Sequence, residues 1–184
     1  KVLNKVDFLA VREPISQNYL NSLNINSSLI PDFAFKASIF KQNEIFIDNS
    51  DDKMKCLYTG GVLSVYPDQP NGIGLKAIRK HIQEIRSLGF NPYFLKVEEK
   101  ESFIEDELRK LGVNILTYDL DYNYQNIGNL LKQFDLLITG RYHIGIFGLM
   151  SNIKTIFLKS NTYKIEGMLE MIKINQDLII SNSI

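Results

Sequence analysis

The sequence predicts a single α/β domain with a mainly parallel sheet and helices on both faces. Short apolar runs alternate with amphipathic stretches of helical length, which is the pattern of parallel βαβ units. Most of the short runs are continuously apolar, as expected for strands that are buried on both faces. We therefore predict a Rossmann-like three-layer domain over residues 1–184, with a strand–helix crossover segment and loop at 1–55 and regular βα units at 56–184.

Composition excludes several classes of protein. The 184 residues are 45% hydrophobic, which is enough for one full-sized core. Lys+Arg and Asp+Glu are both 21, so a large nucleic-acid-binding surface is not expected. No apolar run approaches the roughly 20 residues that a membrane-spanning helix needs. The chain has two histidines, too few for a multi-histidine zinc site. Its single cysteine, Cys56, excludes an internal disulfide framework and is expected as a buried strand thiol. A cytoplasmic location is therefore expected.

The amino-terminal segment is the less regular part of the pattern. Its apolar run at 8–11 predicts a buried strand, which Pro14 ends, and Ser16 is expected to cap the helix that follows. The remaining expected elements are that helix to about Leu23, a strand at 28–30, a turn at Pro31-Asp32, and a polar loop at 36–55 with a short strand near 45–47.

The segment from Cys56 onward alternates clearly. Apolar residues recur at helical spacing between Ile73 and Leu88, and Gly89 supplies the stop. The same reasoning predicts strands at 63–66, 92–97, 113–118, 135–139, 153–158 and 178–180, and helices at 73–88, 101–111, 126–134, 144–150 and 163–172.

The junction after the strand at 135–139 is the strongest candidate site. Gly140 permits a tight turn, and Arg141 and His143 follow where the next helix begins. A helix amino terminus favours anions, a guanidinium matches a carboxylate or phosphate, and an imidazole exchanges protons near neutral pH. The alternative is that Arg141 pairs with Asp135 or another acid and that His143 only caps the helix.

Three further residues are candidates for binding an anion. Arg12 follows the strand at 8–11, and Glu13 is expected to fix either the local backbone or another cation. Lys164 opens a helix, where the helix dipole disfavours a cation unless an anion is bound. Ser64 lies in a predicted strand end that faces the same edge. A surface ion pair for Arg12 and a solvated lysine at 164 remain the alternatives.

Other polar features are interpreted as structural. Gly60-Gly61 and Gly72-Ile73-Gly74 do not complete a phosphate-loop motif, so they are expected to form turns. His81 is expected on the solvated face of its helix. Asp119 and Asp121 have no His or Cys beside them and are expected to lie in a loop and to cap the elements that follow.

Two segments together resemble the polysaccharide pyruvyl transferase family. The first has an Arg-Glu-x-x-Ser start at residues 12–16 and a Pro-Asp-x-x-Phe turn at 31–35. The second is the apolar strand and Gly-Arg-x-His element at 135–143, followed by Lys164 with Gly167 nearby. The order and spacing of these short motifs extend over nearly the whole chain.

This resemblance implies a transfer of pyruvate from phosphoenolpyruvate to sugar hydroxyls as a ketal, in cell-surface polysaccharide biosynthesis. It implies that Arg12, Arg141, Lys164 and Ser64 bind the donor, that His143 is the general acid–base, and that no cofactor or metal takes part. The acceptor would be a glycan or a lipid-linked sugar, and the latter would place the protein at the inner face of the membrane. Family members resemble two-domain GT-B glycosyltransferases, so the chain is expected to correspond to the C-terminal half, without the amino-terminal half.

Two other functions fit the same residues. A GT-B glycosyltransferase would use the cations and the helix end for a nucleotide-sugar diphosphate, with Glu98 or Asp119 placed for the ribose. A non-catalytic module would bind a glycan or another chain within a larger protein.

Overall fold

The computed structural model describes residues 3–41, 47, 53–61, 74–119 and 124–180. Within them, a six-stranded parallel sheet has the strand order β5-β4-β3-β6-β7-β8. The strands are β3 (Lys55–Thr59), β4 (Asn91–Lys96), β5 (Asn114–Thr117), β6 (Leu136–Thr139), β7 (Lys154–Leu158) and β8 (Ile179–Ile180). The order reverses between β3 and β6, as in a Rossmann sheet, so the predicted α/β fold class is confirmed.

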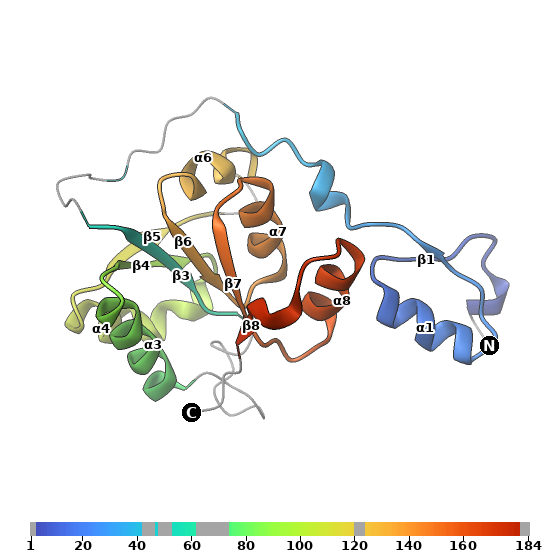
Figure 1. The fold of residues 1–184 in the computed structure, drawn as a ribbon, viewed down its shortest axis with the longest axis horizontal. Coiled ribbons are helices and arrows are strands. Elements are labelled where there is room, and N and C mark those ends of the chain that lie inside the picture. The colour runs from blue at the N-terminus through green and yellow to red at the C-terminus, as the bar shows by residue number, and fades with distance from the viewer. Residues whose placement is uncertain (1–2, 42–46, 48–52, 62–73, 120–123, 181–184) are drawn as a thin grey trace.

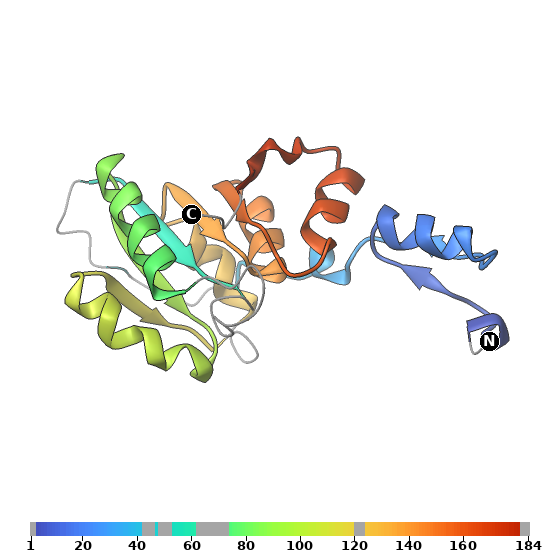
Figure 2. The same cartoon turned by 90° about the horizontal axis from the view of Figure 1, so that it is seen from below.

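Helices cover both faces of this sheet and give three layers (Figures 1 and 2). The α-helices of this part are α3 (Leu75–Ser87), α4 (Ser102–Lys110), α6 (Ile127–Leu131), α7 (Tyr142–Met150) and α8 (Lys164–Met171), and the 3-10 helices are η3 (Glu99–Glu101), η4 (Tyr124–Asn126) and η5 (Gln176–Leu178). One buried cluster packs α3 and α4 on one face, and a larger cluster packs α6, α7 and α8 on the other. We call residues 53–180 of this fold the body.

Two glycines bring α7 close to the sheet. A Cβ on Gly145 would collide with the ring of the fully buried Phe157 in β7, and one on Gly148 would collide with Leu137 in β6. Because neither has a side chain, the helix lies directly over β6 and β7. Its amino terminus is thereby held at the carboxyl edge of the sheet, where ligands bind in such folds.

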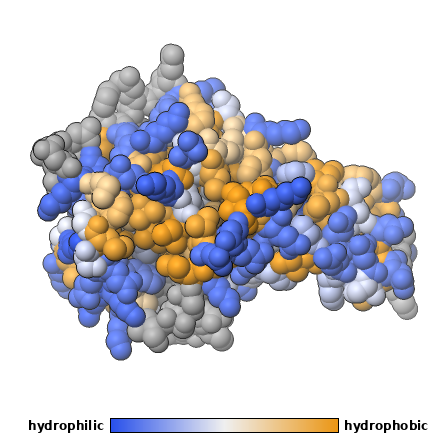
Figure 3. All heavy atoms as spheres, in the orientation of Figure 1, coloured by the Kyte–Doolittle hydropathy of each residue, from blue (hydrophilic) through white to orange (hydrophobic). Residues whose placement is uncertain are grey.

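The amino-terminal segment extends away from the body as an arm (Figure 1). It contains η1 (Leu3–Lys5), β1 (Ala10–Val11), α1 (Pro14–Ser22), β2 (Ser28–Leu29) and η2 (Phe33–Lys36). β1 and β2 pair in parallel, α1 packs against α8, and η2 packs against α7. We call residues 3–36 the arm, and hydrophobic surface continues onto it from the body (Figure 3).

The arm differs from its prediction in two ways. The run at 8–11 is not a buried strand, because only Ala10–Val11 is extended in a ladder, Ala10 is exposed and Phe8 is 66% exposed. Ser16 is not the cap of α1. Glu13 is the cap, and both of its carboxylate oxygens accept from the Ser16 N–H, at 2.9 and 3.0 Å. Of the two roles expected for Glu13, the structure therefore confirms the fixing of the local backbone.

In the body, most predicted elements appear within a few residues of their expected positions. The helix predicted at 144–150 begins earlier, at Tyr142. Cys56 is fully buried in β3, and this burial raises the pKa of its thiol to about 12. His81 was expected to be solvated but is half-buried, with Nδ1 3.2 Å from the Tyr58 hydroxyl, and this burial lowers the pKa of its ring. The strands predicted at 63–66 and near 45–47 lie outside the described residues, apart from Ile47, which is buried.

Candidate functional site

The junction between β6 and α7 is set by close backbone packing at the point where the strand order reverses. The Gly140 N–H donates to the Gly60 carbonyl at 2.9 Å, and a Cβ on Gly61 would lie 2.7 Å from the Gly140 oxygen. The two glycine turns therefore fit only without side chains. Thr139 Oγ1 accepts from the Arg141 N–H at 3.0 Å, so Arg141 takes the capping position of α7 in an extended conformation.

Arg141 is held by two acids from the loop after β4. Its Nη1 lies 2.6 Å from Glu98 Oε1, and its Nη2 lies 2.8 Å from Glu101 Oε1. Glu101 is fully buried and its other oxygen accepts from the backbone N–H groups of Val97 and Glu98. Glu98 is 45% exposed. Glu101 thus anchors the guanidinium in the protein, whereas Glu98 lies toward solvent.

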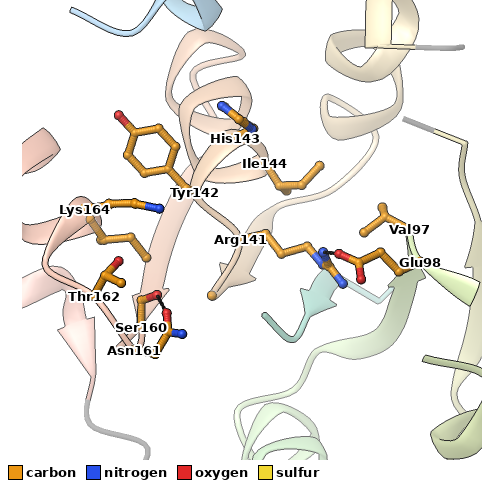
Figure 4. A pocket seen from close by; sticks show the side chains of 12 residues that line it. Val97, Glu98, Arg141, Tyr142, His143, Ile144, Ser160, Asn161, Thr162 and Lys164 are labelled. Carbon is orange, nitrogen blue, oxygen red and sulfur yellow. Dashed lines mark hydrogen bonds and ion pairs between the residues drawn. The ribbon is translucent and has the colours of Figure 1, made fainter. Parts of the chain in front are cut away.

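A hollow of about 290 Å³ opens beside this junction, between the carboxyl ends of β4, β6 and β7. Figure 4 shows Lys164 on one side and Glu98 on the other, with Arg141 between them and its guanidinium turned toward Glu98. The polar residues that line the hollow are Glu98, Arg141, Tyr142, His143, Ser160, Asn161, Thr162 and Lys164. Lys164 is exposed and, among the described residues, forms no ion pair.

The arm reaches this site from the side of η2. Arg12 Nη1 lies 2.6 Å from Asp32 Oδ2, and the Arg12 guanidinium lies 4.6 Å from the centre of the Tyr142 ring. The same Asp32 oxygen lies 3.8 Å from His143 Nε2. Asp32 also caps η2, since its Oδ1 accepts from the Ala34 N–H at 2.9 Å. Asp32 therefore joins the arm cation to the imidazole at the start of α7.

The electrostatics of this cluster keep Asp32 charged and Tyr142 neutral. Partial burial alone would raise the pKa of Asp32, but the hydrogen bonds from Ala34 and Arg12 and the positive charges of His143 and Arg12 outweigh it, so the pKa is lowered. Burial, with the negative charge of Asp32, raises the pKa of Tyr142 to about 12. At neutral pH the Tyr142 ring is thus an uncharged surface on which the Arg12 cation stacks.

The structure brings most of the predicted site residues together. Arg141, His143 and Lys164 line one hollow, and Arg12 adjoins it by stacking on Tyr142. Ser64 lies outside the described residues. Arg12 and Arg141 both pair with acids, as the alternative interpretation of each had predicted. Arg141 does not pair with Asp135, however, because Asp135 accepts a hydrogen bond from the Lys55 N–H.

Two acids that organise the site were not predicted in this role. Glu101 stands three residues after Glu98, a spacing typical of a helix start, but nothing local indicates that it pairs with Arg141. Asp32 belongs to the Pro-Asp-x-x-Phe turn, and nothing in that short motif indicates contacts with Arg12 and His143. Among the described residues, no group of three His, Cys, Asp or Glu side chains could hold a metal ion.

The fold and site define an α/β domain with cations and an imidazole at the carboxyl edge of a Rossmann sheet. The family model for polysaccharide pyruvyl transferase matches residues 1–162, and the chain belongs to that transferase family. The match includes Arg12, Asp32, Arg141 and His143 and ends before Lys164. No curated protein and no solved structure matches the chain. No helix in the described part of the chain is both long and apolar enough to cross a membrane.

Proposed function

We propose that this chain binds phosphoenolpyruvate in the hollow beside Arg141 and transfers its pyruvyl group to a sugar diol as a ketal. The observation that carries the proposal is the convergence of Lys164, Arg141, His143 and the start of α7 on that hollow. Phosphoenolpyruvate has a carboxylate and a phosphate. Two cations and a helix amino terminus are the groups that bind such an anion well.

Lys164 supports this proposal more directly than either arginine. An exposed lysine at the first position of a helix is opposed by the helix dipole. Glu166 lies in the same first turn, but among the described residues it forms no ion pair with Lys164. A phosphate bound beside Lys164 would offset the conflict directly. Arg12 has Asp32 as its partner and is better placed to orient Tyr142 and His143 than to contact the donor.

Glu98 marks the place of the donor carboxylate in this scheme. It meets Arg141 at 2.6 Å through one oxygen, is 45% exposed, and lines the hollow. A carboxylate of the donor would take over the Nη1 contact and displace Glu98 toward solvent, while Glu101 holds the other side of the guanidinium. Arg141 would then bind the donor without losing its buried anchor.

The reaction moves two protons, from the two sugar hydroxyls to the methylene carbon of the donor and to the leaving phosphate. The methylene carbon of the donor gains a proton and becomes a methyl group, the two sugar hydroxyls lose their protons, two C–O bonds form at the former enol carbon, and phosphate leaves with the second proton. His143, 53% exposed and on the rim of the hollow, is the group that exchanges these protons, with the Asp32 carboxylate 3.8 Å from its Nε2. This scheme requires no metal or organic cofactor.

The acceptor in this proposal is a glycan or a lipid-linked sugar of a polysaccharide pathway. Such acceptors are assembled on the cytoplasmic side, so we expect the protein to act in the cytoplasm at the inner face of the membrane. An amino-terminal domain of a GT-B-like enzyme would supply the other wall of the cleft.

One observation favours a second candidate, a nucleotide-sugar transferase. Glu98 follows β4, the second strand of the Rossmann unit, where an acid binds a ribose in dinucleotide-binding folds. Its ion pair with Arg141 argues against this role, because ribose binding would leave the Nη1 contact unfilled.

Calorimetric titration separates these candidates. We expect phosphoenolpyruvate to bind the chain and a UDP-sugar not to bind. Lys164→Met should weaken donor binding at least about tenfold through loss of a charge-assisted contact, while Lys110→Met, an exposed lysine at the end of α4, should not. His143→Gln should spare donor binding and abolish turnover in the active enzyme. Preferential binding of the UDP-sugar would replace the proposal with the second candidate.

A further inference from the structure

A second hollow lies on the other side of His143. It measures about 380 Å³ and is lined by residues of η2, η4 and α7, including Asp32, Phe33, Tyr124 and His143. Among the residues that the structure describes, His143 is the one that lines both this hollow and the one beside Arg141. A side chain shared in this way can contact molecules bound in each.

The second hollow has a different chemistry from the first. Arg141 and Lys164 bring two cations to the first, whereas the second has aromatic rings, alanine methyl groups and the Asp32 carboxylate. Phe33 is 77% exposed and Tyr124 is 38% exposed. Asp32 is held in place by Arg12 and by the Ala34 N–H, and only 11% of its side chain is exposed. The carboxylate is therefore fixed, with its pKa lowered, beside rings that remain open to solvent.

The rings and the carboxylate of the second hollow suit a pyranose ring better than they suit an anionic ligand or a purely apolar one. The C–H face of a sugar can lie on an aromatic ring, whose face is electron-rich, and its hydroxyls can donate to a fixed carboxylate. Ligand sites commonly combine apolar and aromatic walls with a few placed polar groups. A phosphate or carboxylate ligand would be repelled by Asp32.

We propose that the hollow between η2, η4 and α7 binds the pyranose ring of the acceptor, with Phe33 as its stacking surface and Asp32 as its hydroxyl acceptor. This proposal rests on the proposed function, since it assumes a donor in the hollow beside Arg141. An acceptor hydroxyl beside Asp32 meets the imidazole of His143, 3.8 Å from that carboxylate. The imidazole takes the hydroxyl proton as the hydroxyl oxygen, reaching past the edge of the His143 ring, bonds to the former enol carbon of the donor.

The two histidines of the chain allow a direct test by imidazole NMR. His81 lies on the opposite face of the sheet against Tyr58 and serves as the internal reference. Phosphoenolpyruvate should shift the His143 signals and leave those of His81 in place. The methyl pyranosides of galactose, glucose, mannose and N-acetylglucosamine are then added singly to the donor-free chain, and at least one should shift the same His143 signals.

A matched pair of variants completes the test. Phe33→Ala should weaken glycoside binding about tenfold, the loss of one aromatic contact, while leaving the phosphoenolpyruvate shift unchanged. Phe8→Ala, which removes a ring 66% exposed elsewhere on the arm, should change neither. Both rings are largely exposed, so neither variant should affect folding.

The outcomes separate the two proposals. If phosphoenolpyruvate fails to shift His143, the proposed function is wrong. If phosphoenolpyruvate shifts His143 but none of the four glycosides does, or if Phe33→Ala and Phe8→Ala bind a glycoside equally well, the acceptor site is wrong and the donor site stands.

Discussion

The body and the arm each bring an arginine to the candidate site, but they hold it by different means. Arg141 of the body is 12% exposed and pairs with the fully buried Glu101, whereas Arg12 of the arm is 38% exposed and pairs with Asp32 near the surface. The body contributes its half of the site through a packed core. The arm contributes its half through polar contacts and through the packing of α1 on α8 and of η2 on α7, with fewer fully buried residues than the body.

The largest effect should follow from breaking the buried pair. Arg141→Met leaves Glu101 charged and without its cation inside the protein, which we expect to lower the free energy of unfolding by about 3 kcal/mol. Arg12→Met removes a partly exposed ion pair and should cost no more than about 1 kcal/mol. Urea denaturation of the two variants measures the difference.

A double variant checks the cause of that effect. Glu101→Gln combined with Arg141→Met removes both charges, so it should recover much of the lost stability. If the double variant is as unstable as Arg141→Met alone, the buried charge is not the reason, and lost packing around Arg141 would explain the change instead.

Two glycine-to-alanine substitutions compare the packing of the body with the packing of the arm, and the first is in the body. Gly145→Ala places a methyl group against the fully buried Phe157 ring. The helix-propensity gain of about 1 kcal/mol is smaller than the overpacking cost, which reaches about 3 kcal/mol, so we expect net destabilisation in thermal unfolding.

Gly167→Ala should act on the arm instead. Its new Cβ would collide with the side chain of Glu13, which caps α1 against α8. We expect the body to unfold at nearly the same temperature while limited proteolysis within residues 3–36 becomes faster. Equal proteolysis of the variant and the original chain would show that Glu13 can move aside without releasing α1.

A smaller effect concerns the pH dependence of the arm. Because the pKa of Asp32 is lowered in the folded state from its ordinary value of 3.8, its stabilising contribution is present above that value and is lost as the pH falls through the lower, folded pKa. Carboxyl ¹³C NMR should show Asp32 titrating below pH 3.8. Arg12→Met should move that titration upward, since it removes a hydrogen bond and a charge, whereas Lys5→Met should leave it unchanged.

The difference between the body and the arm also explains which parts of the structure could be predicted from the sequence. β6 and the start of α7 follow from local signals, namely an apolar run, then Thr139 and Gly140, so the positions of Arg141 and His143 were foreseen. Their partners were not, because Glu98 and Glu101 reach Arg141 only once β4 and β6 are ordered in the sheet. The run at 8–11 was wrongly predicted as buried, since an apolar run does not show whether anything covers it, and on the arm Phe8 stays exposed.

The smallest change in stability, but an informative change in binding, is expected for Glu98→Gln. Glu98 is 45% exposed and its pair with Arg141 is partly screened, so its loss should alter the free energy of unfolding by less than about 1 kcal/mol. If a donor carboxylate replaces Glu98 on Nη1, removing the competing charge should tighten phosphoenolpyruvate binding several-fold in calorimetric titration. Glu99→Gln, on a neighbouring side chain that is 91% exposed and pairs with Lys96 instead, is the matched control and should leave binding unchanged. Weaker binding by Glu98→Gln would mean that Glu98 itself contacts the ligand, as a nucleotide ribose would require.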